Sequence, residues 1–276
     1  MAGTIFQPLD IVTYETDQPG TADLDKDYVG LVFVEAGQGA RTWNNETIAF
    51  QTGDLFMHHP DANNCIVPEP GSRLHVIKFR QLLTEAGNHP HVLSFTEEQF
   101  RKLEFILYSG QEHQPSLIHL QSDKVSVFAL FNVLLTEATH RRSYADSNIT
   151  LCVLALLNMA ARNILESSYV QAMHPLAITH DVLHYINYHI YEPWRLSVQH
   201  LAGEFNIEVA AFPDYFRQQY SVPLDQYILR YKIRLADTRL RYTKIPLASI
   251  AADLHFDSED ELVTHYKSIE GQWPPR

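Results

Sequence analysis

Residues 198–207 have the sequence VQHLAGEFNI, and residues 247–256 have the sequence LASIAADLHF. Five apolar positions of the first stretch recur in the second at a constant shift of 49 (for example, 247 − 198). They are Val198, Leu201, Ala202, Phe205 and Ile207, followed by Leu247, Ile250, Ala251, Leu254 and Phe256. A small residue at the third position lets a second helix cross the first closely, as a helix-turn-helix requires. The repeat therefore predicts two helix-turn-helix units in tandem.

The segment between the two stretches predicts a long helix over residues 225–243. Its apolar residues recur at helical spacing and define one face. They are Leu229, Ile233, Ala236 and Leu240. The other faces carry five basic residues, and such a run is most often a solvated helix face. Its place between two helix-turn-helix units also suits contact with a phosphate backbone.

Composition and length bound the class of protein. A chain of 276 residues with 45% hydrophobic residues suits two soluble domains. Only Cys65 and Cys152 are present, which argues against a disulfide framework and for a reducing compartment. The opening MAGTIFQPLD lacks the pattern of a signal peptide, and the most apolar stretch, residues 149–164, is too short to span a bilayer. We expect a soluble cytoplasmic protein with no membrane partner.

The distribution of charge argues against nucleic-acid binding. The net charge is −12, and residues 178–276 contribute 10 Lys+Arg against 13 Asp+Glu, a net of −3. The remainder has 11 against 20, a net of −9. Because DNA binding draws much of its affinity from cations that neutralise phosphates, an acidic C-terminal domain is unusual for that function.

The N-terminal part has the pattern of short antiparallel strands. YVGLVFVEAG (28–37), TIAFQTGDLFMHHP (47–60) and SRLHVIKFR (72–80) are β-rich runs, and Gly53-Asp54 is a turn signal inside the second. Such spacing predicts a small antiparallel barrel or sandwich.

Helices follow after Pro90. Residues 96–107, 123–142 and 148–165 have apolar residues at helical spacing, and residues 166–177 form the best linker candidate. The helical pair at 123–165 suits either a dimer interface or packing onto its own domain.

The C-terminal segment resembles the AraC/XylS class of bacterial transcription regulators. The matching residues are YINYHIYEPWRLSVQHLAGEFNI (185–207), YFRQQY (215–220), LDQYILRYKIRLADTRLRYTKIPLASIAADLHF (224–256) and YKSIEGQWPPR (266–276). GQGARTWNNETIAFQTGDLFMHHP (37–60) and GSRLHVIKF (71–79) are similar to the cupin-like sensor barrel of many such regulators. The resemblance implies an α+β protein of two domains. A cupin-like antiparallel β-barrel (1–120) would bind a small effector, often a sugar or an aromatic acid, helices (121–170) would form a homodimer, and an all-α double helix-turn-helix (178–276) would bind promoter DNA.

Helix position and the resemblance together assign candidate DNA contacts. The predicted base contacts are Tyr215, Gln218, Gln219, His265 and Lys267. The predicted phosphate contacts are Arg217, Arg230, Lys232, Arg234, Arg239 and Arg241.

The two recognition helices depart from the family pattern. The first, near residues 209–220, contains Pro213, which clashes with the preceding turn inside a helix, and Asp214. The second, DSEDELVTHYKS (257–268), presents four carboxylates to a polyanion and has Thr264 where the family commonly has Arg. The carboxylates belong to Asp257, Glu259, Asp260 and Glu261. The alternative hypothesis is therefore an AraC-like protein that has lost DNA binding and acts through ligand or protein contacts.

Other kinds of site find less support. Trp43, His58 and His75 are candidates to face an effector. Strand alternation sends the adjacent His58 and His59 to opposite faces, so the sequence predicts no metal site and no cofactor. Neither cysteine has a cationic neighbour in sequence to activate it. An enzyme of the cupin class, the third hypothesis, lacks the metal-ligand spacing that it needs.

Overall fold

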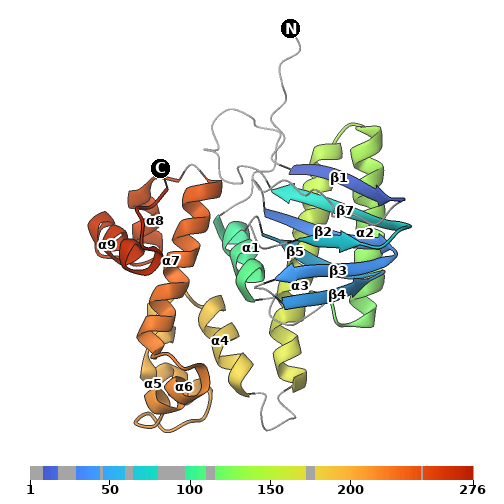
Figure 1. The fold of residues 1–276 in the computed structure, drawn as a ribbon. Coiled ribbons are helices and arrows are strands. Elements are labelled where there is room, and N and C mark those ends of the chain that lie inside the picture. The colour runs from blue at the N-terminus through green and yellow to red at the C-terminus, as the bar shows by residue number, and fades with distance from the viewer. Residues whose placement is uncertain are drawn as a thin grey trace. The chain divides into compact units, whose positions relative to one another are not determined.

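The computed structural model describes residues 9–17, 29–43, 46–59, 65–79, 97–109, 116–171, 178–243 and 245–275. The chain divides into two compact units (Figure 1), residues 1–165 (unit 1) and residues 166–276 (unit 2). Unit 1 contains all the described strands, together with helices. In the described part of unit 2, the regular secondary structure is helical. The α+β class predicted from the sequence is confirmed.

The larger sheet of unit 1 has four antiparallel strands in the order β1 (Leu9–Thr16), β7 (Ser72–Phe79), β2 (Val29–Ala36) and β5 (Leu55–His58). Strand β1 pairs with β7 along its whole length. The strands predicted from the sequence lie in residues 28–80, so β1 was not predicted. The residues of β1 pair with residues of β7 that lie 56 (72 − 16) to 70 (79 − 9) positions further along the chain, so no local hairpin signal indicates this strand.

The smaller sheet contains β4 (Glu46–Gln51), β3 (Gln38–Trp43) and β6 (Ile66–Pro68), in that order. The predicted turn at Gly53-Asp54 joins β4 to β5, so it connects the two sheets and closes no hairpin. Apolar side chains from both sheets form a shared core. They are Val32, Val34, Phe50, Phe56, Ile66, Leu74 and Val76. In the described part of the chain the strands pair into two separate sheets, so the architecture is two antiparallel sheets packed on a shared core.

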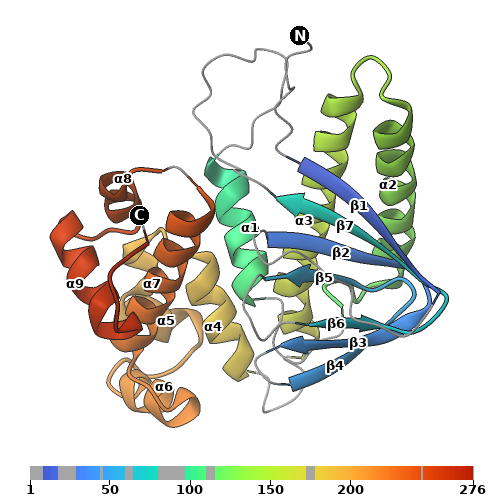
Figure 2. The ribbon, with the colours of Figure 1, turned by 45° about the horizontal axis from the view of Figure 1, so that its top comes forward.

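Helices cover the other face of the larger sheet. Figures 1 and 2 show α2 (Gln121–His140) and α3 (Ala145–Gln171) lying together on one side of it. Phe33 of β2 stacks on Phe131 of α2, with ring centroids 4.3 Å apart. Helix α1 (Glu97–Ser109) buries Phe100, Leu103 and Ile106.

Helix α3 is longer than the sequence predicted. It covers residues 166–171, which were assigned to a linker, while residues 172–177 of that linker lie outside the described part. Within it, Ala145–Glu166 is long and apolar enough to cross a membrane by length and composition, and 56% of its most apolar window is buried inside the protein. The predicted segment 149–164 was too short because Ala145 and the residues after it already belong to the helix.

Unit 2 consists of short helices around one long helix. Helix α4 (Ile178–Tyr188), the 3-10 helix η1 (Pro193–Leu196), α5 (Val198–Glu204) and α6 (Phe212–Tyr220) precede the long helix α7 (Leu224–Tyr242). Helices α8 (Leu247–Asp253) and α9 (Glu259–Glu270) follow it. The small residues Ala202 and Ala251 are both buried, as the repeat predicts.

Candidate nucleic-acid interface

The turns of the two helix-turn-helix units have the same backbone geometry. Asn206 and His255, again 49 residues apart, adopt the left-handed conformation with φ of 54° and 56°. In each turn the next amide reaches five residues back to close the end of the helix. These bonds are Ile207 N–H to Ala202 O and Phe256 N–H to Ala251 O, both 2.9 Å. This pattern is the Schellman ending of a helix, so the repeat predicted from side chains extends to the backbone.

The first recognition helix, α6, begins at Phe212. Pro213 therefore lies in the first turn, where a missing amide costs nothing, and the predicted clash is wrong. Phe212 and Phe216 are buried, which turns the opposite face to solvent. Arg217, Gln218 and Gln219 are exposed there, with Asp214. Tyr215 is half-buried, and its ring packs 6.1 Å from that of Phe212.

The second recognition helix, α9, uses part of its acidic sequence to start itself. The hydroxyl of Ser258 accepts a hydrogen bond from the Glu261 amide (3.1 Å), and the Glu261 carboxylate accepts one from the Asp257 amide (2.6 Å). This pair of bonds is similar to a capping box, except that Glu261 accepts from the residue before the N-cap Ser258, and carboxylates in a first turn also favour the helix dipole. Glu259 and Asp260 remain exposed at the end of the helix that enters the groove in DNA-bound helix-turn-helix proteins.

The two basic side chains of α9, His265 and Lys267, each contact another residue of the helix or of the segment that follows it. The His265 ring nitrogen lies 3.8 Å from a Glu261 carboxylate oxygen. The Lys267 ammonium lies 2.7 Å from the centroid of the Trp273 ring. Thr264, where the resemblance expects Arg, donates its hydroxyl to the Asp260 carbonyl of its own helix (2.7 Å). Helix α9 therefore offers DNA less positive charge than α6.

The five basic residues of α7 divide by environment. Arg230 and Arg234 are exposed. The Lys232 ammonium lies 5.4 Å from the centroid of the Phe256 ring, and burial lowers the pKa of Lys232. Arg241 makes two bonds to the Asp237 carboxylate, of 2.8 and 2.7 Å.

The structure corrects the prediction that Arg239 contacts a DNA phosphate. Its side chain is buried, with a relative exposure of 2%, because it faces the interior of unit 2. Its guanidinium pairs with Asp253 of α8 and donates to the Tyr191 hydroxyl (2.9 Å). A side chain enclosed in this way does not reach a phosphate, and we leave Arg239 out of the proposed DNA contacts.

Formal charge along the three helices follows the same division. Helix α7 carries five basic and two acidic residues, a net of +3. Helix α6 carries Arg217 and Asp214, a net of 0, and α9 carries one Lys against four carboxylates, a net of −3. The positive charge of unit 2 is therefore concentrated on the helix that joins the two helix-turn-helix units.

The three candidate effector contacts do not come together. His75 lies on the helix-covered face of its sheet, where its ring nitrogens contact Thr13 Oγ1 (2.9 Å) and Glu35 Oε2 (2.7 Å). His58 lies on the opposite face of the same sheet, in register with Gly30. Trp43 ends β3, and its side chain lies outside the described part of the structure. Among the described residues no group of three His, Cys, Asp or Glu side chains could hold a metal ion.

A row of polar residues that sequence reasoning missed surrounds His58. Gly30 pairs with His58 on one side and with Lys78 on the other, and Lys78 pairs in turn with Asp10. The register places this row on the face that contributes to the core between the sheets. On the facing sheet, Arg41 lies with its guanidinium 4.9 Å from the Phe56 ring centroid. Burial lowers the pKa of Arg41 to about 10, against the opposing effect of Asp54. The sequence signal for this row was a single charged residue within an apolar strand, such as Lys78 in SRLHVIKF (72–79).

Comparison with known proteins found solved structures that align with most of the chain at low sequence identity. No protein-family model matches the sequence, and no curated protein matches it. ToxT from Vibrio cholerae aligns over 97% of both chains, with 13% identity and a TM-score of 0.33. A ToxT structure with bound unsaturated fatty acid covers 96% of this chain and 93% of its own, with 9% identity and a TM-score of 0.32. CuxR covers 86% of this chain and 79% of its own, with 11% identity and a TM-score of 0.37. CuxR is described as an AraC-like transcriptional activator.

Proposed function

We propose that this protein is an AraC-like transcription regulator whose unit 2 binds promoter DNA. The observation that carries the proposal is the duplicated helix-turn-helix, in which buried side chains, left-handed turn residues and capping bonds all repeat at a shift of 49. A chain that keeps two such units in tandem keeps the geometry that presents two helices to a duplex.

The two units contribute unequally in this proposal. Gln218 and Gln219 of α6 are exposed amides of the type that pair with adenine, and Arg217 lies beside them. Arg230 and Arg234 on α7 supply phosphate contacts, with smaller contributions from Lys232 and Arg241. Tyr215, His265 and Lys267 complete the proposed set. The charges on α9 make it the weaker reader of the two.

Selection from a pool of random duplex DNA tests the proposal. We expect enrichment of one motif and a steep fall in affinity as salt rises, because counterions are released from phosphates. Arg217→Ala should weaken binding and reduce the salt slope by about one. Arg142→Ala, an exposed arginine of unit 1, is the matched control and should change neither. Absence of any enriched motif at low salt, from folded protein, would reject DNA binding.

Neutralising the α9 carboxylates separates the proposal from its alternative. In a DNA-binding protein, the double substitution Glu259→Gln and Asp260→Asn should raise affinity, since it removes phosphate repulsion at the groove-facing end of the helix. It should also cost about 0.3–1 kcal/mol per site in stability, because both carboxylates favour the helix dipole. If neither the natural protein nor this variant binds duplex DNA, the alternative holds, in which unit 2 acts through ligand or protein contacts.

Unit 1 is the proposed effector sensor. The support is chemical: His58, Lys78 and Arg41 are buried polar side chains on strands whose inward faces otherwise build an apolar core. Polar side chains buried among apolar ones, one of them with a lowered pKa, mark a candidate functional site. A small polar effector at this row would contact His58 of the predicted set.

A homodimer through α2 is also proposed. None of the ten exposed residues of α2 is Asp, Glu, Lys or Arg. They are Gln121, Ser122, Val125, Ser126, Ala129, Asn132, Val133, Thr136, Thr139 and His140. A solvated helix face normally carries charge, whereas the centre of a protein interface is depleted of it. The resemblance assigns the same helices to dimerisation.

A further inference from the structure

We propose that unit 1 carries a second small-molecule site, a polar crevice between the smaller sheet and the start of α2, which takes a small hydrophilic amine. The crevice encloses about 490 Å³, within the range of ligand pockets. The polar side chains that line it and carry the argument belong to Gln38, Gln51, Asp54, Glu69, His119 and Lys124. None of them belongs to the buried polar row around His58, although the charge of Asp54 acts on the pKa of Arg41. This inference rests on the proposed function only in treating unit 1 as a sensor.

One wall is the outer face of the smaller sheet. Gln38 of β3 lies opposite Gln51 of β4 in the ladder, and their neighbours Gly39 and Phe50 point toward the core. Strand alternation therefore turns both amides away from the core. The Gln38 amide donates to a Glu69 carboxylate oxygen (2.7 Å), and Glu69 is exposed. This wall presents amide groups and a pre-oriented carboxylate.

The other wall centres on a buried carboxylate. Asp54 is 3% exposed, and one of its carboxylate oxygens accepts a hydrogen bond from the backbone N–H of Gln51 (2.8 Å). Its second oxygen lies 3.8 Å from the Lys124 ammonium, in the first turns of α2. This ion pair places the Lys124 side chain in the lining of the crevice and partly offsets its charge.

Charge balance in the crevice selects the ligand class. Asp54 and Glu69 contribute two carboxylates, but Asp54 lies beside Lys124 and also interacts with the charge of Arg41, which leaves Glu69 as the exposed carboxylate of the lining. Partial desolvation, together with the charge of Lys124, lowers the pKa of His119 and so favours the neutral imidazole, which both donates and accepts. The exposed Glu69 carboxylate favours a cation and disfavours an acid. An ammonium group beside Glu69, with hydroxyl or amide groups toward Gln51 and His119, gives each of these three side chains a partner of matching chemistry.

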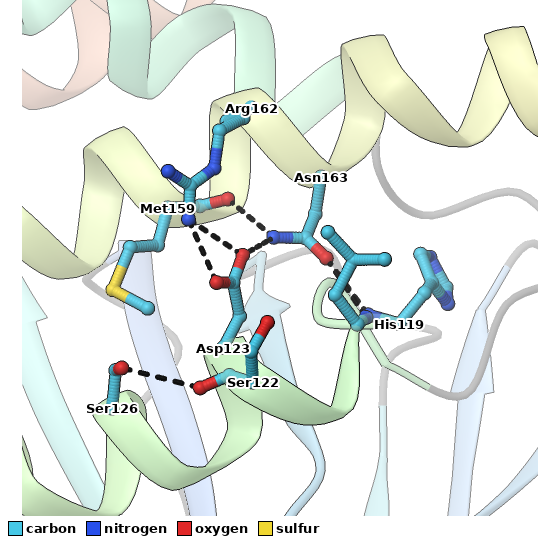
Figure 3. A network of polar contacts seen from close by, with 8 residues as sticks. His119, Ser122, Asp123, Ser126, Met159, Arg162 and Asn163 are labelled. Carbon is cyan, nitrogen blue, oxygen red and sulfur yellow. Dashed lines mark hydrogen bonds and ion pairs between the residues drawn. The ribbon is translucent and has the colours of Figure 1, made fainter.

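The crevice is attached to the helix that leads toward unit 2. Figure 3 shows the side-chain amide of Asn163, from α3, at the centre of this attachment. Its oxygen accepts bonds from the backbone amides of His119 (3.0 Å) and Leu120 (3.2 Å), and its nitrogen donates to Asp123 (2.6 Å). A ligand that holds His119 therefore also restrains residues bonded to α3.

Binding of matched ligands to the full chain tests the proposal. The probes are glucosamine and ethanolamine, with glucose and ethylene glycol as uncharged analogues and glucuronate as the acid, each titrated calorimetrically to millimolar concentration. We expect the two amines to bind and the other three not to bind. Glu69→Gln should weaken amine binding about tenfold, because it removes a charge-assisted hydrogen bond. Gln51→Ala should weaken it less, and Glu98→Gln, an exposed carboxylate of α1, should have no effect.

Hydrogen exchange gives an independent readout. Bound amine should slow exchange at the amides of residues 119 and 120, which bond to Asn163. If neither amine binds, if both bind no better than their analogues, or if Glu69→Gln leaves their affinity unchanged, the proposal is overturned. The DNA selection is run on the same protein without amines, so its failure is separate from failure at the crevice.

Discussion

At the scale of single residues, Asp123 shows how a buried charge is held. Burial raises the pKa of its carboxyl, but the bonds from Arg162 (2.7 and 2.8 Å) and Asn163 (2.6 Å) outweigh burial and hold that pKa below its usual range. A carboxyl with a depressed folded-state pKa contributes stability that is complete above its unfolded pKa, near 3.9, and is lost as pH falls through the folded value.

This sign gives a pH prediction for Asp123→Asn. The natural protein should lose more stability than the variant as pH falls from about 5 to about 3, since only the natural protein has this carboxylate to protonate. Denaturant unfolding followed by circular dichroism at each pH measures the difference. Asp146→Asn removes an exposed partner of Arg141 and should leave the pH dependence nearly unchanged. Parallel pH curves for the natural protein and Asp123→Asn would contradict the assignment.

Arg239 makes a second residue-scale prediction. Replacing it with Met leaves the Asp253 carboxylate without its buried partner, which typically costs about 3 kcal/mol. Urea unfolding should show this loss, whereas Arg230→Met, an exposed change on the same helix, should stay within about 0.5 kcal/mol. Equal stabilities for the two variants would place Arg239 at the surface after all.

At the scale of elements, the two helix-turn-helix units should respond alike to the same substitution. Ala202→Leu and Ala251→Leu each force a larger side chain into the crossing of two helices and should cost about 1–3 kcal/mol. Ala248→Leu adds the same atoms on the exposed face of α8 and should be nearly neutral. Thermal unfolding compares the three variants. Tolerance at one buried alanine and not at the other would show that the repeat is not equivalent in packing.

Sequence reasoning succeeded for elements whose signal is local. Helix α7 was predicted at residues 225–243 and observed at Leu224–Tyr242, because its apolar residues recur at helical spacing over about three turns, from Leu229 to Leu240. It failed where a strand pairs with a strand distant in sequence, and where the first residue of a helix decides whether a proline is tolerated. Strand β1 pairs with β7 across the whole sheet region, and Pro213 is harmless only because α6 begins one residue before it.

At the scale of the whole molecule, the uncharged face of α2 predicts self-association. Val125→Glu and Val133→Glu place carboxylates in the proposed interface and should convert a dimer to a monomer, as measured by light scattering after size exclusion. Val209→Glu is the matched control in unit 2, where valine is similarly exposed. A natural protein that is monomeric at all concentrations would contradict the proposed dimer.

The sequence by itself determined the repeated helical scaffold, the antiparallel character of the N-terminal region and the acidic start of α9. These features depend on periodicity, turn residues and composition, which are properties of the chain before it folds. The tertiary structure decided which charges reach solvent. Five basic residues lie on one helix, yet only packing against α8 shows that Arg239 is enclosed while Arg230 and Arg234 are exposed. Helical spacing fixes the angle between side chains, and only the neighbouring helices determine which of those angles is covered.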